Sequence, residues 1–346
     1  MNKPVQVQTD TATPTDFTLP VEDGVPADGL VSHLRDHVSV PVAGLLWLGA
    51  AAVSAAWPDQ TAWSRTTLLA ILQAAVGIGL VGSALFLARR PVFKVISEYG
   101  LWFGALAVLI TAWEVLTAKT GILPLPFFPP PQSILEVYTD DVSRLLESIA
   151  HSMLLLLPGY LLGGLVGFTA GVSIGWSKAV HYWGYPILRF VGPLPATAWL
   201  PIAFFFFPST FSAATFLIAL STAFPVAVLT SSGISTVTSA YYDIARTLGA
   251  DTRFLITKVA IPAALPNVFV GLFMGLGSSF AVLIVAEMMG VKAGLGWYLQ
   301  WAQGWAAYAN LYGALIIMAL LFSSLISLLF YVRDRMLVWQ KGIVRW

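Results

Sequence analysis

The chain has 346 residues, of which 58% are hydrophobic and only 10% are charged, with 18 basic and 17 acidic side chains. Soluble globular domains carry about 25% charged residues, so this chain lacks the polar surface that such a domain needs, in agreement with a mean hydropathy of +0.80. The composition therefore predicts an integral membrane protein. A net charge of +1 and the absence of cysteine exclude a strongly basic nucleic-acid binder, a disulfide-stapled secreted domain and a thiolate metal site.

The first 39 residues are polar, carry six acidic side chains and lack the basic start and apolar run of a signal peptide. We expect a cytoplasmic tail over residues 1–39, two additional membrane helices over 40–99 and the main membrane domain over 100–346. Within the tail, His33 and His37 stand four residues apart and could share a helix face. Because no acidic or cysteine ligand accompanies them, a polar helix before the membrane is favoured over a metal site.

Eight stretches of the chain are apolar enough to cross a bilayer as helices, a crossing that takes roughly 20 residues. In chain order they are Val40–Trp57, Thr67–Ala88, Gly100–Ala118, Ser152–Gly175, Phe190–Phe207, Phe211–Gly233, Val268–Met288 and Tyr312–Val332. The first is short, and proline interrupts the fifth. The sequence therefore predicts an all-α integral membrane protein with about eight transmembrane helices.

Lysine and arginine indicate the orientation of these spans. With the N-terminus inside, the outer segments hold four basic residues, and they are Arg65, Lys119, Arg144 and Lys292. The inner segments hold fourteen, and they are Lys3, Arg35, Arg89, Arg90, Lys94, Lys178, Arg189, Arg246, Arg253, Lys258, Arg333, Arg335, Lys341 and Arg345. Since basic residues concentrate in cytoplasmic loops, both termini are predicted to be cytoplasmic.

Signatures of catalysis are missing from the sequence. Residues 171–178 (GVSIGWSK) have a superficial likeness to a phosphate loop, but they lack GxxxxGK[ST] and end a membrane span. HExxH does not occur, and GxSxG occurs only at residues 171–175, within a predicted membrane span rather than on a strand-to-helix turn. We expect no catalytic residue, no metal site and no cofactor in this chain.

Glycine recurs every four residues through the fourth span, at Gly159, Gly163, Gly167, Gly171 and Gly175. This spacing puts small residues along one helix face, where a second backbone can approach closely. Ordinary packing within the chain is favoured over a moving or subunit-facing contact.

Five prolines punctuate the fifth and sixth spans, at Pro193, Pro195, Pro201, Pro208 and Pro225. Each removes a backbone donor and kinks or breaks a helix. At membrane depth, freed carbonyls are tolerated only where protein or a water-filled cavity covers them. The region is therefore a candidate transport path, with plain kinked packing as the equal alternative.

Two carboxylates lie within predicted spans, where a charge usually faces a cavity or a partner. Glu287 follows the small-residue stretch 275–281 (GLGSSFA), so we assign it to a path or gate, whereas Glu114 is expected to reach the outer interface. The residues predicted to line the path or its gate are Pro195, Thr197, Trp199, Pro201, Ser278, Ser279 and Glu287.

The loop after the sixth span, Tyr241–Pro266, is polar and helix-prone up to Leu248, turns at Gly249 and is helical again until its prolines. It resembles the EAA loop of bacterial ABC importer permeases, which reads EAA, three residues, G, nine variable residues and I-x-L-P. Residues 243–245 (DIA) stand where the loop has EAA, Gly249 matches its glycine, and residues 261–266 (IPAALP) resemble its end. Aspartate for glutamate and isoleucine for the first alanine are departures that keep the helix and its charge.

Neighbouring segments resemble the nitrate, sulfonate, taurine and bicarbonate branch of that family. Residues 192–201 (GPLPATAWLP) look like its R-P-x-P-P-x-A-x-x-P stretch, and residues 127–133 (FFPPPQS) look like its LPSP element. Residues 286–288 (AEM) and 294–296 (GLG) are similar to its AE and GLG positions. The resemblance runs from about Leu101 to the C-terminus.

The resemblance implies a type I ABC importer permease core plus two extra N-terminal helices, in the bacterial cytoplasmic membrane. It implies two permease copies, most simply a homodimer, each bound to a cytoplasmic ATPase that carries ATP and Mg, and an external binding protein that delivers the solute. No nucleic acid is implied. The residues assigned to the ATPase contact are Asp243, Ile244, Ala245, Arg246, Leu248, Gly249, Ala250, Ile261 and Pro262.

Two other functions compete with this one. A proton-coupled secondary transporter would use Glu287 or Glu114, but it would want a second pair of broken helices, and none is evident. A membrane scaffold leaves the elbow-shaped loop unexplained. The solute stays open between an anion and a small neutral organic molecule, because no predicted span has an arginine or lysine in its interior.

The orientation is testable because the chain has no cysteine. A cysteine that replaces Asp140 should react with a membrane-impermeant thiol reagent in intact cells, because the basic-residue pattern places residues 119–148 outside. Asp251→Cys, in an inner loop, is the matched control and should react only after the membrane is opened. Labelling of Asp140→Cys only after opening would show that the span count is wrong.

Overall fold

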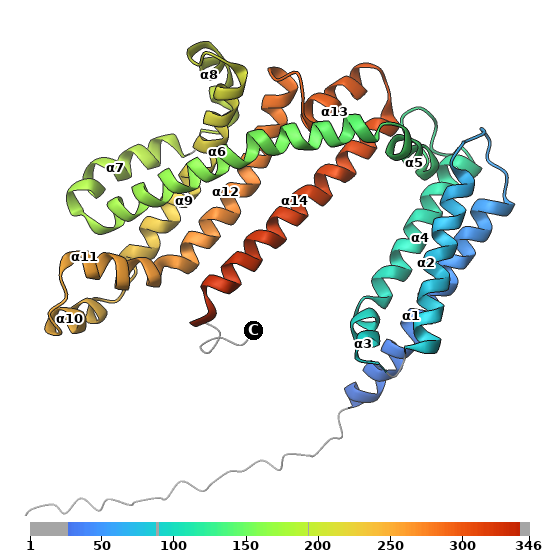
Figure 1. The fold of residues 1–346 in the computed structure, drawn as a ribbon, viewed down its shortest axis with the longest axis horizontal. Helices are drawn as coiled ribbons and strands as arrows, with labels where there is room; N and C mark the ends of the chain where they lie inside the picture. Colours follow the sequence, from blue (N-terminus) through green and yellow to red (C-terminus); the bar gives the residue numbers. More distant parts are fainter. Residues whose placement is uncertain (1–26, 88–89, 193, 340–346) are drawn as a thin grey trace, which may run out of the picture. The chain divides into compact units, whose positions relative to one another are not determined.

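The computed structural model describes residues 27–87, 90–192 and 194–339, apart from the side chains of residues 27–37, 91 and 92. The secondary structure of these ranges is entirely helical, which confirms the predicted fold class. They form two compact units (Figure 1). The first holds the described residues up to Ala51 together with Leu72–Leu109, and the second holds Ala52–Ile71 together with the described residues from Ile110 on.

The first unit contains most of α1 (Ala27–Ala56) and α2 (Thr66–Phe86), the short α3 (Pro91–Glu98) and the beginning of α4 (Gly100–Glu114). Helices α1 and α2 approach closely at two glycines, because a Cβ added to Gly44 would lie 3.1 Å from the carbonyl oxygen of Gly77. His33 and His37 lie in α1, but their side chains are outside the described ones, as is the predicted tail up to residue 26.

The second unit holds the remaining helices, all of them within residues 100–346, which the sequence assigns to the main membrane domain. They are η1 (Val115–Lys119), α5 (Pro131–Asp140), α6 (Val142–Trp176), α7 (Lys178–Val191), η2 (Ala196–Trp199), α8 (Leu200–Phe206), α9 (Thr210–Ser235), α10 (Ser239–Thr247), α11 (Thr252–Phe254), η3 (Leu255–Ala260), α12 (Ile261–Met289), α13 (Leu295–Gly304) and α14 (Tyr308–Met336). Figure 1 shows α10 and α11 at the end of α9 and α12 opposite to α13.

Seven helical segments of the described chain are long and apolar enough to cross a membrane. The predicted fifth span, Phe190–Phe207, is the exception, because it holds only the end of α7 together with η2 and α8. Helix α7 and the η2–α8 segment form a pair that is bent by 87°. Counted as one span, this bent pair restores the predicted total of eight.

Several predicted boundaries were wrong. Helix α6 begins at Val142 rather than Ser152, and the seventh span is continuous from Thr252 rather than from Val268. The prediction that prolines end the second elbow helix also fails, because the chain stays helical from the π-helical turn η3 through Pro262 into α12. The sixth span is likewise one helix with Pro225 inside it.

Helices α6 and α9 pack along their length through the glycine stripe. Each stripe glycine faces a small residue or carbonyl of α9, so that a Cβ added to Gly171 would lie 2.7 Å from the carbonyl oxygen of Ala227. The facing residues of α9 also recur every four positions, and they are Thr215, Ala219, Ala223, Ala227 and Ser231. Packing within the chain, the favoured interpretation of the stripe, is confirmed.

The glycine stripe predicts that the stability of the protein depends strongly on side-chain size at these positions. Gly171→Ala should lower the thermal unfolding midpoint of the purified protein, because overpacking a close contact costs about 1–3 kcal/mol. Gly277→Ala, in the interior of α12, is the matched control, because an added Cβ would meet only Phe322 at an ordinary 3.9 Å. Equal midpoints for the two variants would contradict the close approach.

Candidate functional site

A cavity of about 420 Å³ lies between the α7–η2 turn, α9 and α12. Four of the seven residues predicted for the path line it, and they are Pro195, Thr197, Trp199 and Ser278. Phe224 and Met274 also line the cavity, although neither was predicted to lie on the path. Pro201, Ser279 and Glu287 lie outside the lining. The role of the lining residues in transport stays a prediction.

The proline inside α9 leaves a carbonyl without its helical partner, and α12 supplies a replacement. Pro225 has no N–H to donate to the carbonyl of Ser221, four residues earlier. The Ser278 hydroxyl of α12 donates to this carbonyl over 3.0 Å. Because the freed carbonyl is paired across the interface, α9 continues as one helix while its proline faces the cavity.

Glu287 forms a buried clamp between three segments. Its side chain is 0% exposed, and it accepts hydrogen bonds from the Ser152 hydroxyl of α6 (2.7 Å) and from the backbone N–H of Gly296 (2.7 Å). The Ser152 hydroxyl accepts in turn from the backbone N–H of Leu295 over 2.8 Å. Gly294 adopts a φ of +110°, in the region that favours glycine. The AE and GLG segments noted in the sequence are therefore one hydrogen-bonded unit.

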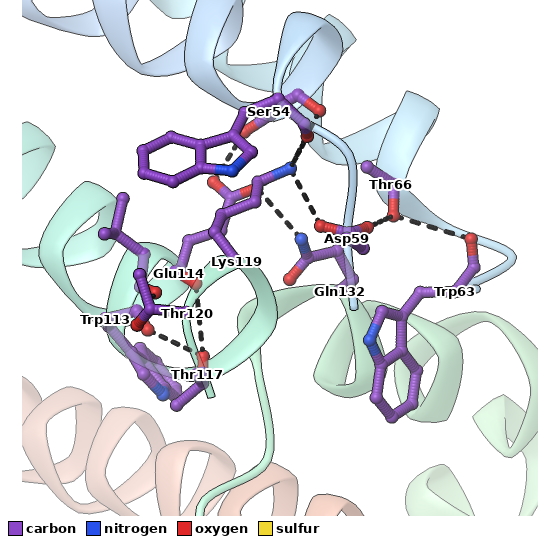
Figure 2. A network of polar contacts seen from close by, with 12 residues as sticks. Ser54, Asp59, Trp63, Thr66, Trp113, Glu114, Thr117, Lys119, Thr120 and Gln132 are labelled. Atoms are coloured by element: carbon purple, nitrogen blue, oxygen red, sulfur yellow. Dashed lines mark hydrogen bonds and ion pairs between the residues drawn. The ribbon is translucent and has the colours of Figure 1, made fainter. Parts of the chain in front are cut away.

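A second buried cluster surrounds Lys119 at the end of η1 (Figure 2). Its ammonium lies 2.8 Å from Asp59 Oδ1 and 3.4 Å from Glu114 Oε1, and it donates to the carbonyl of Trp57 over 2.6 Å. Gln132 Nε2 donates to Glu114 Oε1 over 2.9 Å. The prediction that Glu114 reaches the outer interface was wrong, since both charged side chains are buried and paired.

This cluster places a basic residue in the last turn of the third span. The third span runs to Lys119, one residue beyond its predicted end, and its last turn is a π-helix. The lysine ammonium can be buried there because two carboxylates and backbone carbonyls replace its hydration shell. The closeness of Glu114 and Lys119 in the sequence could have indicated their ion pair. The other carboxylate, Asp59, lies far away in the chain, so its contact with Lys119 could not be read from the sequence.

The elbow begins with α10, which presents an apolar face to its surroundings. Tyr241, Ile244 and Leu248 are 61%, 59% and 83% exposed, respectively. Their spacing of three and four residues puts them on one side of the helix. Gly249 follows with a φ of +84°, which confirms the predicted turn. Nothing lies within 4 Å of a Cβ added to this glycine, so backbone conformation and not a steric obstacle requires it.

The opposite side of α10 anchors the elbow to the membrane helices. The Tyr242 ring packs edge-on against Trp176 at the end of α6, with 5.6 Å between ring centroids. Both border a buried apolar cluster formed by Ile234 of α9 together with Ala260 and Ala264. Asp251 caps α11 by accepting from the backbone N–H of Phe254 over 2.8 Å.

The residues predicted for the ATPase contact differ in their exposure. Asp243, Ile244, Arg246, Leu248 and Gly249 are exposed, whereas Ala245, Ala250, Ile261 and Pro262 are only partly exposed. Leu248 is the most exposed apolar side chain of this set, and the role of these residues in ATPase docking stays a prediction. The ion pair between Arg246 and Asp243 (3.4 Å) is exposed, so it adds little stability.

Polar contacts also join the helices near α13. Asp141 accepts hydrogen bonds from the Tyr298 hydroxyl (3.1 Å) and from Asn310 Nδ2 (3.0 Å). Burial, and secondarily the charge of Asp141, raises the pKa of Tyr298 to about 12. The Arg65 side chain donates to Asp140 and lowers the pKa of that carboxyl. Among the described residues, no group of three histidine, aspartate or glutamate side chains could hold a metal ion.

The Glu287 clamp makes a specific prediction about Ser152. Ser152→Ala removes one donor to Glu287 and the acceptor for Leu295 N–H, and a buried group left unpaired costs about 1–3 kcal/mol. The thermal unfolding midpoint of the purified protein should fall. Ser173→Ala is the control on the same helix, because its exposed hydroxyl only donates to the carbonyl of Thr169. Equal midpoints would mean that the clamp adds no stability.

Comparison with known proteins identifies the family. Residues 163–337, about half of the chain, match the family described as binding-protein-dependent transport system inner membrane component. The chain is 29% identical over 249 residues to a putative aliphatic sulfonates transport permease of Bacillus subtilis, covering 71% of this chain and 90% of the relative. It is 31% identical over 207 residues to the taurine transport system permease of Escherichia coli, covering 58% and 75%. It is 29% identical over 247 residues to a nitrate import permease of Synechocystis, covering 69% and 87%.

The family match includes the residues that line the cavity and the whole elbow. The relatives support an importer permease rather than a proton-coupled transporter. The chain therefore belongs to the binding-protein-dependent transport family and is a multi-pass membrane permease subunit of an ABC importer, in the branch that includes nitrate, sulfonate, taurine and bicarbonate permeases.

Proposed function

We propose that this permease receives a small solute from an external binding protein, passes it through the cavity between α7–η2, α9 and α12, and docks its ATPase on α10. The observation that supports this most directly is the exposed apolar face of Tyr241, Ile244 and Leu248. Such a face on a helix outside the membrane spans favours burial against a partner protein. ATP and Mg belong to that partner, and this chain contributes no catalytic residue and binds no cofactor.

The anchoring of the elbow supports a role in coupling. Tyr242 contacts the end of α6, and the cluster beneath it includes residues of α9 and of the η3–α12 segment. A push on α10 would therefore be passed to three helices at once, two of which form walls of the cavity. Rigid helices that shift together are a common basis for alternation between two states.

The orientation and assembly follow from the same proposal. The α10–α11 end faces the cytoplasm, both termini are cytoplasmic when the bent pair is counted as one span, and the binding protein meets the opposite end. The membrane is the bacterial cytoplasmic membrane, and two copies of the chain pair as a homodimer. Residues 40–99 are an addition to the transporter core of residues 100–346. The related permeases are named for aliphatic sulfonates, taurine and nitrate, so the solute is small.

The docking face is tested by a charge on α10. Leu248→Asp should sharply reduce co-purification of the cognate ATPase and solute uptake, because a disrupted interface anchor costs about 2 kcal/mol or more. Membrane insertion should persist, since Leu248 lies outside the spans. Ile122→Asp is the matched control, an equally drastic change at an exposed apolar residue away from the elbow. Normal co-purification and uptake with Leu248→Asp, at matched abundance, would exclude α10 as the docking site.

A further inference from the structure

We propose that the cavity between the α7–η2 turn, α9 and α12 selects an uncharged organic solute with an aromatic or otherwise planar body, rather than an inorganic anion or a sulfonate. The proposal rests on the proposed function, in which this cavity is part of the transport path. It concerns only the class of solute that the cavity accepts.

The lining of the cavity carries no charge. None of the described residues that line it is a lysine, arginine, histidine, aspartate or glutamate. The buried charges of this unit lie elsewhere, with Glu287 held by Ser152 and Gly296, and Lys119 held by its carboxylates. An anion that left water for this cavity would have no opposite charge to replace its hydration.

The cavity is also poor in hydrogen-bond donors. The Ser278 hydroxyl is committed to the carbonyl of Ser221, and the Ser221 hydroxyl donates to the carbonyl of Ile218 over 2.8 Å. Pro195 and Pro225 have no N–H. The Thr197 hydroxyl and the Trp199 indole N–H make no hydrogen bond within the described chain, so they are free to bind a ligand. These two side-chain donors suit a carbonyl or amide group of a neutral solute.

The apolar walls favour a flat molecule. Trp199, Phe224 and Met274 line the cavity and offer ring faces and a polarisable sulfur. Gly192 stands where the R-P-x-P-P-x-A-x-x-P stretch has arginine, and the Phe224 ring fills the space that its side chain would need. The wall beside Gly192 is therefore an aromatic ring. The volume of about 420 Å³ lies in the range of sites for single small molecules.

Because the chain has no cysteine, a single cysteine can report on occupancy. Thr197→Cys places a thiol in the lining, and its reaction with N-ethylmaleimide is followed in the full chain co-purified with its ATPase in lipid nanodiscs. Probes are offered as neutral and anionic partners, together with nitrate and taurine. Benzamide and benzoate have nearly the same shape, and orotate is uracil with an added carboxylate. Thr238→Cys, at the exposed start of α10, is the control for direct effects of a probe on the reagent.

The neutral member of at least one pair should slow labelling of Thr197→Cys about tenfold at a concentration about ten times its dissociation constant. Its anionic partner, nitrate and taurine should not slow it, and no probe should affect Thr238→Cys. Trp199→Phe keeps the wall but removes the indole donor, and it should weaken protection by the neutral probe.

Equal or better protection by benzoate, orotate, nitrate or taurine would overturn the proposal, and so would the absence of protection by every probe. Neither result would remove the ATPase from the complex. An error in the proposed solute class is therefore distinguishable from an error in the proposed function. The latter would appear in the docking test, as normal co-purification of the ATPase with Leu248→Asp.

Discussion

Close packing of the backbones of α6 and α9 is the constraint on which the rest of the second unit depends. Apolar surface gives helices little reason to associate within lipid, so close approach through small residues is a main source of their affinity. The glycines of α6 meet the small residues and carbonyls of α9 at every turn of the contact. This contact fixes the axial register of α6 against α9. It thereby positions Ser152 to bond Glu287, and it positions Trp176, at the other end of the contact, to pack against Tyr242.

Glu287 and Lys119 are buried charged residues that each join segments distant in the sequence. A lone charge in a membrane is expensive, and each of them is surrounded by partners from segments distant in the sequence. Glu287 joins α12 to α6 and to the turn before α13. Lys119 joins η1 to the α1–α2 loop through Asp59 (Figure 2). Both charged side chains are paired within the fold and neither lines the cavity. The cavity between the α7–η2 turn, α9 and α12 therefore has no charged lining residue among the described ones.

The elbow and the cavity are mechanically linked through α9 and α12. The end of α9 contributes Ile234 to the cluster beneath α10, and its middle contributes Pro225 to the cavity wall. The Ser278–Ser221 hydrogen bond ties α12 to α9 beside that proline. A displacement that starts at the elbow therefore reaches the cavity through elements that are already bonded to one another, which is what the proposed coupling of ATP hydrolysis to transport needs.

The sequence alone determined the class of protein, seven of the spans, the turn at Gly249 and the face on which the glycines of α6 pack. These features depend on composition, on apolar length and on periodicities of three to four residues, which are local properties of the chain. Tertiary structure decided that Pro225 does not break α9, because the partner of the freed carbonyl is Ser278, 57 residues away. It decided that Glu287 is a clamp bound to Ser152, 135 residues away, and that Lys119 pairs with Asp59. Hydrogen bonds and ion pairs between distant segments leave no periodic mark on the sequence, so only the packed helices reveal which polar residues are structural and which surround the cavity.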